Sequence, residues 1–414
     1  MLAGMDGIKD EFAPYPLEHV RSMFPMLSKL MDSGYVYLDS AATSLTPQPV
    51  IDAMQRYYTE QRVTIHRGGY PQARELAEAY ESVRSQTAAF IGASRASEIV
   101  FTKSATEALN LVAWGWAAPR LKEGDEILVS GMEHHANFVP WQQVARRSGA
   151  RVRVIPVDPA TGNIDMSALR EMLSAKVRVA AVTGMSNVNG AEPPIAEIAD
   201  LVHDCGGTVV VDGTQLVAHK ATRLRELGCD FLAFSGHKLC GPTGVGVLYG
   251  RQELLEATNP LVYGGDMILT VTEKRSTFQD PPRRFEGGTP NIAGVLGLGA
   301  AIEFLNELGM TRIERHEQSL AVQLREICSR TPYLKLLAAP DVPAAAGIVS
   351  FAPEETRPNE VLEMIEKHGV MVRAGKLCAH PFLSELGTTN VIRASCGPYT
   401  SSNDIDALVA ALSR

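Results

Sequence analysis

The sequence predicts an α/β protein in which a large domain is built on a mainly parallel sheet and a smaller α/β domain follows at the C-terminus. Short apolar runs alternate with helical stretches through the middle of the 414 residues, and the order of expected elements changes after an apolar helix at 293–308. Alternation of this kind is typical of a sheet covered by helices on both faces. A chain of this length can also fill two hydrophobic cores.

The expected strands of the large domain are short and nearly continuous in Val, Ala and Ile, which indicates burial on both faces. They cover residues 98–103, 126–130, 152–157, 177–185, 208–213, 231–236 and 245–250. Helical stretches such as 168–175 and 196–206 lie between them. The alternation predicts a parallel or mixed sheet that helices cover on both faces.

The region after the apolar helix predicts the smaller domain. Its expected elements are a helix at 313–330, a strand at 346–352, a helix at 358–369, a strand at 370–373 and a final helix at 402–413. We therefore place the large domain at 31–304 and the small domain at 305–414. Residues 1–30, with a short helix near 16–24, are expected to pack onto the small domain, because a short amphipathic helix needs an apolar surface to cover.

Composition excludes several function classes. The chain carries 39 basic and 47 acidic residues, a formal charge of −8, with both signs interspersed, so we expect no nucleic-acid partner. An acidic start and the lack of an apolar run of membrane-spanning length favour a cytoplasmic protein with no membrane partner. The six cysteines show no Cys-x-x-Cys spacing, which argues against a disulfide framework and against a metal site.

Two ionisable residues stand at the ends of expected buried strands. Lys238 follows the strand at 231–236, where an ammonium either extends to solvent or has a task such as forming a Schiff base. Asp212 ends the strand at 208–213, where a carboxylate can cap the next helix or pair with a buried cation. From position alone, both alternatives stay open for each residue.

Two further polar segments also follow expected strands. The segment SATE at 104–107 has the pattern of a capping box, and the start of a helix also attracts phosphate. His134 and His135 follow the strand at 126–130. Adjacent histidines point to different sides, so a paired metal site is disfavoured. One of them is interpreted as an aromatic platform or a proton carrier, with a neutral surface pair as the alternative.

These four segments are expected to meet, because open α/β sheets bind ligands at the carboxyl ends of their strands. A lysine, an acid and a phosphate site together indicate pyridoxal phosphate, which takes a lysine Schiff base and an acidic partner for its ring nitrogen. A dinucleotide is the rival ligand. However, neither VGVLYG (245–250) nor GVLGLGAA (294–301) gives Gly-x-Gly-x-x-Gly at a strand-to-helix turn, and no P-loop motif occurs.

Ten motifs, in order along the chain, resemble those of SufS-like (group II) cysteine desulfurases. They are DSAATSLTP (39–47), HRGGY (66–70), TKSATEALN (102–110), MEHHANFVPW (132–141), SNVNG (186–190), VDGTQ (211–215), FSGHKLCGPTG (234–244), RRFEGGTPN (283–291), RAGKLCAHP (373–381) and IRASCGPY (392–399). The resemblance implies aminotransferase class V, fold type I of the pyridoxal-phosphate enzymes, and a homodimer with active sites at the subunit interface.

The resemblance also implies roles for individual residues. Lys238 resembles the lysine that holds the cofactor, Asp212 the partner of its ring nitrogen, and His134 the residue that stacks on the ring. Further cofactor contacts are implied for Gln215, Asn187, Ala105, Thr106, Ser235, His237 and, from the other subunit, Thr289. Arg393, with Arg373 nearby, resembles the arginine that binds the substrate carboxylate, which a planar guanidinium suits.

Cys378 resembles the sulfur-accepting cysteine of the family. A lone cysteine is usually a buried and inert thiol. Here Lys376 and His380 lie two residues to either side, and cationic neighbours can lower the pKa of a thiol. Cys240 is the alternative, although its apolar, glycine-rich setting favours packing. The chain departs from the family at Lys376 and Leu377, where members commonly carry two histidines.

The implied activity is sulfur transfer: L-cysteine becomes L-alanine, a persulfide forms on Cys378, and an acceptor protein takes the sulfur for iron–sulfur cluster assembly. Another class V activity, such as a selenocysteine lyase acting on L-selenocysteine, an epimerase or an aminotransferase, is the alternative among enzymes and does not need Cys378. A catalytically idle binding partner is the alternative outside enzymes. The joint presence of Lys238, Asp212, Cys378 and Arg393 disfavours it.

Overall fold

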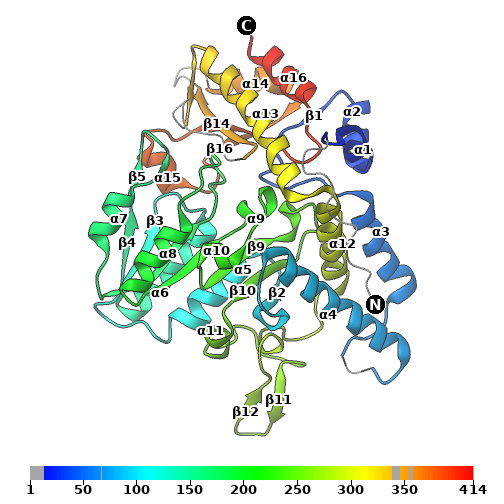
Figure 1. Cartoon of the computed structure of the whole chain (residues 1–414), viewed down its shortest axis with the longest axis vertical. Coiled ribbons are helices and arrows are strands. Elements are labelled where there is room, and N and C mark those ends of the chain that lie inside the picture. Colours follow the sequence, from blue (N-terminus) through cyan, green and yellow to red (C-terminus); the bar gives the residue numbers. More distant parts are fainter. Residues whose placement is uncertain (1–13, 67, 338–345, 354–357, 414) are drawn as a thin grey trace.

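The computed structural model describes residues 14–66, 68–337, 346–353 and 358–413. The chain divides into a broad lower part around a large sheet and an upper part around a small sheet (Figure 1). The predicted boundaries at 30 and 304 stay predictions, and residues 1–13 of the predicted N-terminal segment lie outside the described residues.

The large sheet has seven strands and is mainly parallel, as predicted. Their order is β2 (Ile99–Thr102), β10 (Gly246–Gly250), β9 (Phe231–Ser235), β8 (Thr208–Asp212), β7 (Val177–Thr183), β3 (Glu126–Ser130) and β4 (Arg151–Ile155). Strand β10 runs antiparallel to both of its neighbours, and the other pairs are parallel. The six other strands therefore have their carboxyl ends at one edge of the sheet, with β2 on one side of β10 and the remaining five on the other.

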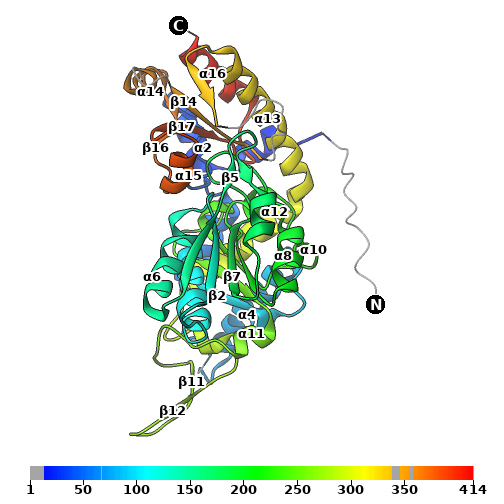
Figure 2. The same cartoon turned by 90° about the vertical axis from the view of Figure 1, so that its left-hand side faces the viewer.

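Both faces of this sheet are covered, which explains the apolar strands. On β8, Val209 and Val211 belong to one core, whereas Val210 belongs to a second core on the other face. Helices α8 and α12 lie on one side of the sheet and α6 on the other (Figure 2). The helices of this part are α3 (Gln48–Arg56), α4 (Pro71–Ile91), α5 (Ala105–Asn110), α6 (Val139–Ser148), α7 (Met166–Met172), α8 (Ile195–Asp204), α9 (Leu216–His219), α10 (Leu224–Leu227), α11 (Gln252–Glu256) and α12 (Ile292–Leu308).

The upper part holds a four-stranded antiparallel sheet. Its order is β13 (Leu334–Leu336), β14 (Ile348–Pro353), β17 (Val391–Ser395) and β16 (Arg373–Gly375). The helices beside it are α13 (Met310–Arg330), α14 (Pro358–Lys367), α15 (His380–Glu385) and α16 (Ser402–Leu412). The strand expected at 370–373 is divided, because β15 (Val370–Met371) pairs instead with β1 (Val36–Tyr37).

The N-terminal helices α1 (Leu17–Ser22) and α2 (Pro25–Asp32) contact the C-terminal part of the chain. Arg21 forms an ion pair of 2.7 Å with Asp404 at the start of α16, and the Tyr15 hydroxyl donates to the Pro398 carbonyl at 2.7 Å. The ring of Tyr15 also stacks on His316 of α13. The segment is thus held by directional contacts as well as by apolar ones.

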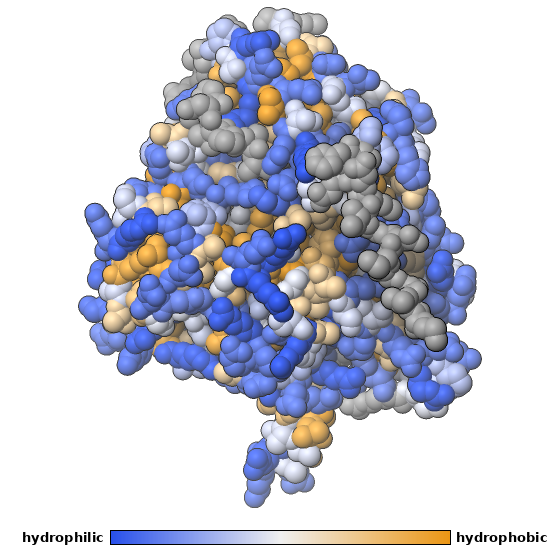
Figure 3. Space-filling model, in the orientation of Figure 1, coloured by the Kyte–Doolittle hydropathy of each residue, from blue (hydrophilic) through white to orange (hydrophobic). Residues whose placement is uncertain are grey.

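Two short hairpins were not predicted. One pairs β5 (Val157–Asp158) with β6 (Asn163–Ile164), and the other pairs β11 (Ile268–Val271) with β12 (Ser276–Phe278). The second projects from the lower end of the molecule and carries exposed apolar groups, visible in orange in Figure 3. Across the described residues, no single helix is long and apolar enough to span a membrane; α12 and α13 pass that test only together, bent by 76°.

Candidate active site

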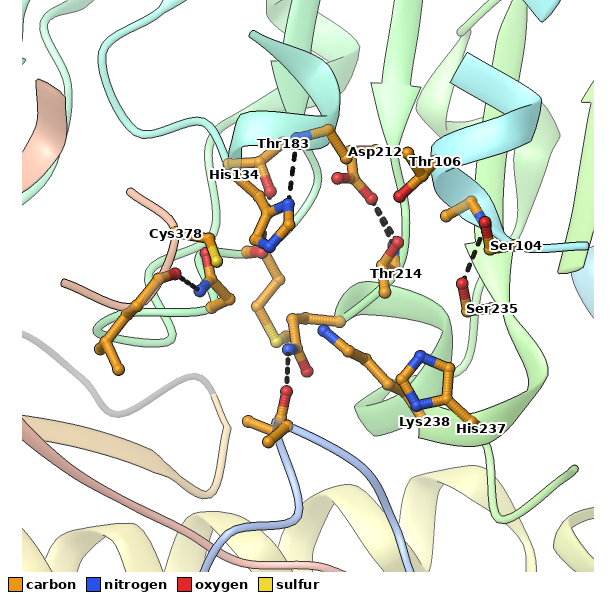
Figure 4. A pocket seen from close by; sticks show the side chains of 18 of the residues that line it. Ser104, Thr106, His134, Thr183, Asp212, Thr214, Ser235, His237, Lys238 and Cys378 are labelled. Carbon is orange, nitrogen blue, oxygen red and sulfur yellow. Dashed lines mark hydrogen bonds between the residues drawn. The ribbon is translucent and has the colours of Figure 1, made fainter. Parts of the chain in front are cut away.

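A cavity of about 400 Å³ opens at the carboxyl edge of the large sheet, facing the small sheet (Figure 4). Side chains from several separate segments line it. They include Ala41, Ala105, Thr106, His134, Asn187, Asp212, Gln215, Ser235, His237, Lys238, Arg373, Cys378 and Arg393. The structure therefore brings together every sequence-predicted site residue except Thr289, and it does so where strands β2, β3, β7, β8 and β9 end.

Lys238 reaches the cavity from a single tight turn after β9, Gly236–Lys238. Burial, reinforced by the nearby charge of Arg393, lowers the pKa of Lys238 to about 8, although Asp212 acts in the opposite direction. Its amine is therefore neutral in a large share of molecules at mildly alkaline pH. A neutral amine is the form that attacks a carbonyl or accepts a proton.

The side chain of Asp212 closes the turn before α9 rather than capping that helix, and its pairing with a cation stays a prediction. Its Oδ1 accepts a hydrogen bond from the Thr214 amide at 3.0 Å and another from the Thr214 hydroxyl, which closes the turn after β8. No hydrogen bond reaches Oδ2 from the residues that the structure describes. One oxygen thus fixes the side chain, and the other is available to a cationic group in the cavity.

His134 presents a neutral ring to the same space. Burial lowers its pKa to about 4, although Asp212 raises it in part. Its Nδ1 accepts from the Ala136 amide at 3.1 Å, so Nε2 carries the proton. The neighbouring residue, Glu133, has a fully buried carboxyl that accepts from Asn137 at 2.7 Å and from the hydroxyl of Ser130. Glu133 was not singled out from sequence, although it lies within the quoted motif.

Hydroxyl and amide groups gather at the opposite end of the cavity, near the start of α5. Ser104 caps α5 by accepting from the Glu107 amide at 3.3 Å, as its capping pattern predicted. The Ala105 amide donates to Ser235 Oγ at 2.8 Å, which joins the start of α5 to the end of β9. Thr106 and His237 complete this end (Figure 4). These donors suit a phosphate.

The wall facing the strand ends is the segment that carries Cys378. Leu377 and Cys378 both adopt left-handed backbone, with φ of 49° and 54°, which is uncommon for such residues. Two bonds hold the segment: Asn187 Nδ2 donates to the Leu377 carbonyl at 2.9 Å, and the His135 amide donates to the Cys378 carbonyl at 2.8 Å. The strained backbone is thereby fixed from the large sheet.

Cys378 is exposed, whereas the other five cysteines are buried or half-buried. The rival Cys240 is fully packed, and burial raises its pKa to about 12. All six thiols are free. Among the described residues, no group of three or more His, Cys, Asp or Glu side chains could hold a metal ion.

Both predicted arginines line the cavity, and a residue that sequence reasoning did not assign joins them. Arg393 is 2% exposed; its Nη1 donates to the Asn187 carbonyl at 2.9 Å and its Nη2 to Asp39 at 3.1 Å. Arg373 binds the same carboxylate through Nε and Nη2, the shorter contact being 2.8 Å. Asp39 therefore orients both guanidinium groups before any substrate carboxylate arrives.

Thr289 lies elsewhere. It is exposed and does not line the cavity of its own chain. The resemblance places it in the pocket of a second subunit, and that role stays a prediction.

The donor set fits pyridoxal phosphate. The cavity holds an amine of lowered pKa, a carboxylate with one oxygen free of described partners, a neutral aromatic ring, and hydroxyl and amide donors at one end. These match an aldehyde, a ring nitrogen, a ring face and a phosphate. Lys238, Asp212, His134 and Ser235 would hold those four parts.

A family model described as Aminotransferase class-V matches residues 36–408. The chain belongs to this family. It is 40% identical over 401 residues to a cysteine desulfurase of Synechococcus elongatus, covering 97% of this chain and 64% of that protein. A cysteine desulfurase of Dickeya dadantii is 40% identical over 402 residues, with 97% of each chain covered. The chain thus spans less than two thirds of the first relative and nearly all of the second.

Structural similarity agrees with this membership. The crystal structure of the cysteine desulfurase CsdA (S-sulfonic acid) from Escherichia coli matches with a TM-score of 0.90 and 38% identity, covering 97% of this chain and 98% of that one. The predicted class V family, the fold type I α/β architecture and the enzyme class, a cysteine desulfurase, are confirmed. The SufS-like subtype and the roles of single residues stay predictions.

Proposed function

We propose that this class V enzyme is a SufS-like cysteine desulfurase that uses pyridoxal phosphate to take sulfur from L-cysteine onto Cys378. One observation carries the proposal. The most exposed thiol of the chain stands in the wall of the same cavity as Lys238 and Asp212, on the segment opposite the strand ends. A lyase or aminotransferase needs the lysine and the acid but has no use for a thiol there.

The strand-end residues prepare the substrate. When bound, the cofactor withdraws electrons from the substrate and so weakens its Cα–H and Cβ–S bonds. Lys238 takes the Cα proton on its neutral amine. Asp212 Oδ2 would accept the proton of the ring nitrogen in a hydrogen bond, and the neutral ring of His134 would lie beside the cofactor without adding a second cation. Arg393 binds the substrate carboxylate from the other wall.

The thiol then receives the sulfur. Cys378 Sγ, as thiolate, forms a bond to the substrate sulfur while the Cβ–S bond breaks. The electron pair of the broken bond goes to Cβ, which takes a proton, Lys238 returns a proton to Cα, and alanine leaves. An acceptor thiolate next attacks the outer sulfur of the persulfide and restores the Cys378 thiolate. No external oxidant is required, because sulfur is oxidised as carbon is reduced.

The partners follow from the same geometry. The Cys378 segment is held by Asn187 and by the His135 amide, so we propose that the sulfur acceptor is a protein that comes to the cavity, as in iron–sulfur cluster assembly.

We also propose a cytoplasmic homodimer. Exposed Thr289 and the apolar side chains of the β11–β12 hairpin, Leu269 and Val271, support a second subunit that covers them.

The test measures the alanine formed from L-cysteine and the position of the persulfide on the protein. With L-cysteine, the wild type should form alanine and a persulfide that mass spectrometry finds on Cys378. Cys378→Ala should keep the visible band of the lysine-linked cofactor but lose the persulfide and nearly all alanine, whereas Cys205→Ala should behave like the wild type. Full alanine production by Cys378→Ala, or a persulfide on Cys240, contradicts the proposal. Retained activity with L-selenocysteine alone would favour a selenocysteine lyase.

A further inference from the structure

A buried chain of hydrogen bonds leads from the cavity to the long helix α13. Gln215 lines the cavity, and its Nε2 donates to the Ala41 carbonyl at 2.9 Å. Its Oε1 lies 3.1 Å from His219 Nε2, and His219 Nδ1 lies 2.6 Å from Glu317 Oε2. The exposed fractions of Gln215, His219 and Glu317 are 3%, 5% and 1%. The family roles implied by the sequence assign nothing to His219 or Glu317.

The backbone sets this alignment. Gln215 and His219 stand four residues apart at the two ends of helix α9, so their side chains share one face. The His219 amide also donates to the Gln215 carbonyl at 3.1 Å. Glu317 comes from α13, which packs against α9. Glu317 is therefore linked to Gln215, which lines the cavity, through the ring of His219.

The hydrogen-bond directions determine where the protons are. A backbone carbonyl only accepts, so the Gln215 amide turns its nitrogen to Ala41 and its oxygen to His219. His219 Nε2 must then donate. Its Nδ1 faces a carboxyl oxygen at 2.6 Å, a contact that also needs a proton. The pair therefore holds two protons, either as imidazolium with carboxylate or as imidazole with carboxylic acid, and is neutral overall.

Besides His219, four described titratable groups interact electrostatically with Glu317. They are the phenol of Tyr15, the thiols of Cys240 and Cys396, and the ring of His316. Burial raises the pKa of the phenol and of both thiols and lowers the pKa of His316, so all four are neutral at pH 7. Oε1 of Glu317 has no hydrogen-bond partner within the described part of the chain. His219 is thus the group that shares a proton with Glu317.

We propose that His219 and Glu317 are positioning residues that hold the Gln215 amide with an N–H directed into the cavity, where it donates to the ring oxygen of bound pyridoxal phosphate. The inference rests on the proposed function. One hydrogen of the amide goes to Ala41, and the other is available to the cavity that Gln215 lines. If the pair lost its second proton, His219 Nε2 would accept, the amide would turn over, and its oxygen would face the ring oxygen.

The test is a pH titration of the visible absorption of the holoenzyme, because a donor at the ring oxygen stabilises its negative charge and lowers the pKa of the lysine-linked cofactor. Two double variants are compared, and both replace Glu317 and His219 with uncharged side chains, so they remove the same buried charges. Glu317→Gln with His219→Gln keeps a donor toward Gln215, whereas Glu317→Gln with His219→Leu removes it. The midpoint should stay near the wild type in the first and rise by about one pH unit in the second, the size of one charge-assisted hydrogen bond.

Two controls separate positioning from stability. Gln215→Leu should raise the midpoint by the same amount, and combining it with the donor-loss pair should add nothing further. His203→Leu breaks the 2.8 Å contact of His203 with Asp230, a histidine–carboxylate pair that does not line the cavity, and should leave the midpoint unchanged.

Equal midpoints in the two double variants, or additive shifts with Gln215→Leu, would overturn the inference. Nitrogen NMR of His219 in the unaltered holoenzyme gives an independent result: a bare Nε2 at pH 7 also overturns it. Failure of the wild type to develop the visible band with pyridoxal phosphate would instead remove the proposed function on which the inference rests.

Discussion

The two walls of the cavity are built in opposite ways. The strand-end wall rests on a sheet packed between two cores, and it presents an amine and a carboxylate whose surroundings are fixed by burial. The facing wall is a short segment with left-handed backbone, held by two hydrogen bonds, and its thiol is exposed. Proton chemistry needs the desolvated wall, and a sulfur atom that must meet another protein needs the exposed one.

The same difference in environment distinguishes two cysteines, Cys240 and Cys378. Cys240 follows Lys238 by two positions, yet it is packed in the core and burial raises its pKa to about 12. Cys378 stands across the cavity with its side chain open. Proximity to the lysine in sequence therefore says little about reactivity, because thiolate formation depends on the environment of the sulfur.

We expect the largest loss of activity from replacing Lys238 in the strand-end wall. Lys238→Ala should lose the absorption band of the lysine-linked cofactor and all measurable alanine production, because no other described lysine lines the cavity. Lys103→Ala, whose side chain is 83% exposed, is the matched control and should match the wild type. An unchanged band in Lys238→Ala would mean that another lysine holds the cofactor.

The lowered pKa of Lys238 gives this prediction a pH dependence. Only the neutral amine attacks an aldehyde, and a pKa near 8 makes that form dominant above about pH 8. Uptake of pyridoxal phosphate by the cofactor-free protein should therefore slow about tenfold for each pH unit below 8 and level off above it. A rate that keeps rising through pH 10 would show an amine with the ordinary lysine pKa.

A smaller effect should distinguish the two arginines that share Asp39. Arg393 is buried, so Arg393→Ala should raise KM for cysteine at least tenfold, because a charged hydrogen-bonded pair contributes about 1.5–3 kcal/mol. Arg373 has a side chain that is 50% exposed, and Arg373→Ala should raise KM less, since water screens its charge. The reverse order in saturation kinetics would make Arg373 the carboxylate clamp.

The sheet was predictable because its strands are buried on both faces. The expected strand at 126–130 coincides with β3, and those ending at 213 and 236 differ from β8 and β9 by one residue. The β11–β12 hairpin was missed because its residues are largely exposed and pair with each other alone, so no core imposes an apolar pattern on them.

The residues of the cavity were predictable where strand ends converge and were missed where distant segments meet. Asp212 ends strand β8 and Lys238 lies in the turn after β9, so the topology alone brings them together. Asp39 contacts Arg393 across 354 positions, and Glu317 contacts His219 across 98. The spacing of residues along the sequence predicts neither the Asp39–Arg393 pair nor the Glu317–His219 pair. Such pairs between distant segments are seen only in the folded structure.

We expect the smallest effect on activity from removing side-chain contacts beside the Cys378 segment while the strand-end wall is unchanged. The His135 amide holds the Cys378 carbonyl, and that backbone bond survives in His135→Ala. His135→Ala removes the ring contact with His380, whose centroids lie 4.5 Å apart. It also removes a long hydrogen bond of 3.4 Å that the His380 amide donates to His135 Nε2.

We expect His135→Ala and His380→Ala each to slow persulfide formation by a few-fold, with the double variant no slower than His135→Ala, because ring pairs contribute about 0.5–1.5 kcal/mol and both changes remove the same ring contact. Rapid quenching with mass spectrometry measures the rate, and the absorption band of the cofactor should stay unchanged because neither ring lines the strand-end wall. A shifted band, or effects that multiply in the double variant, would show that these histidines act on the cofactor or separately. The two walls would then not be independent.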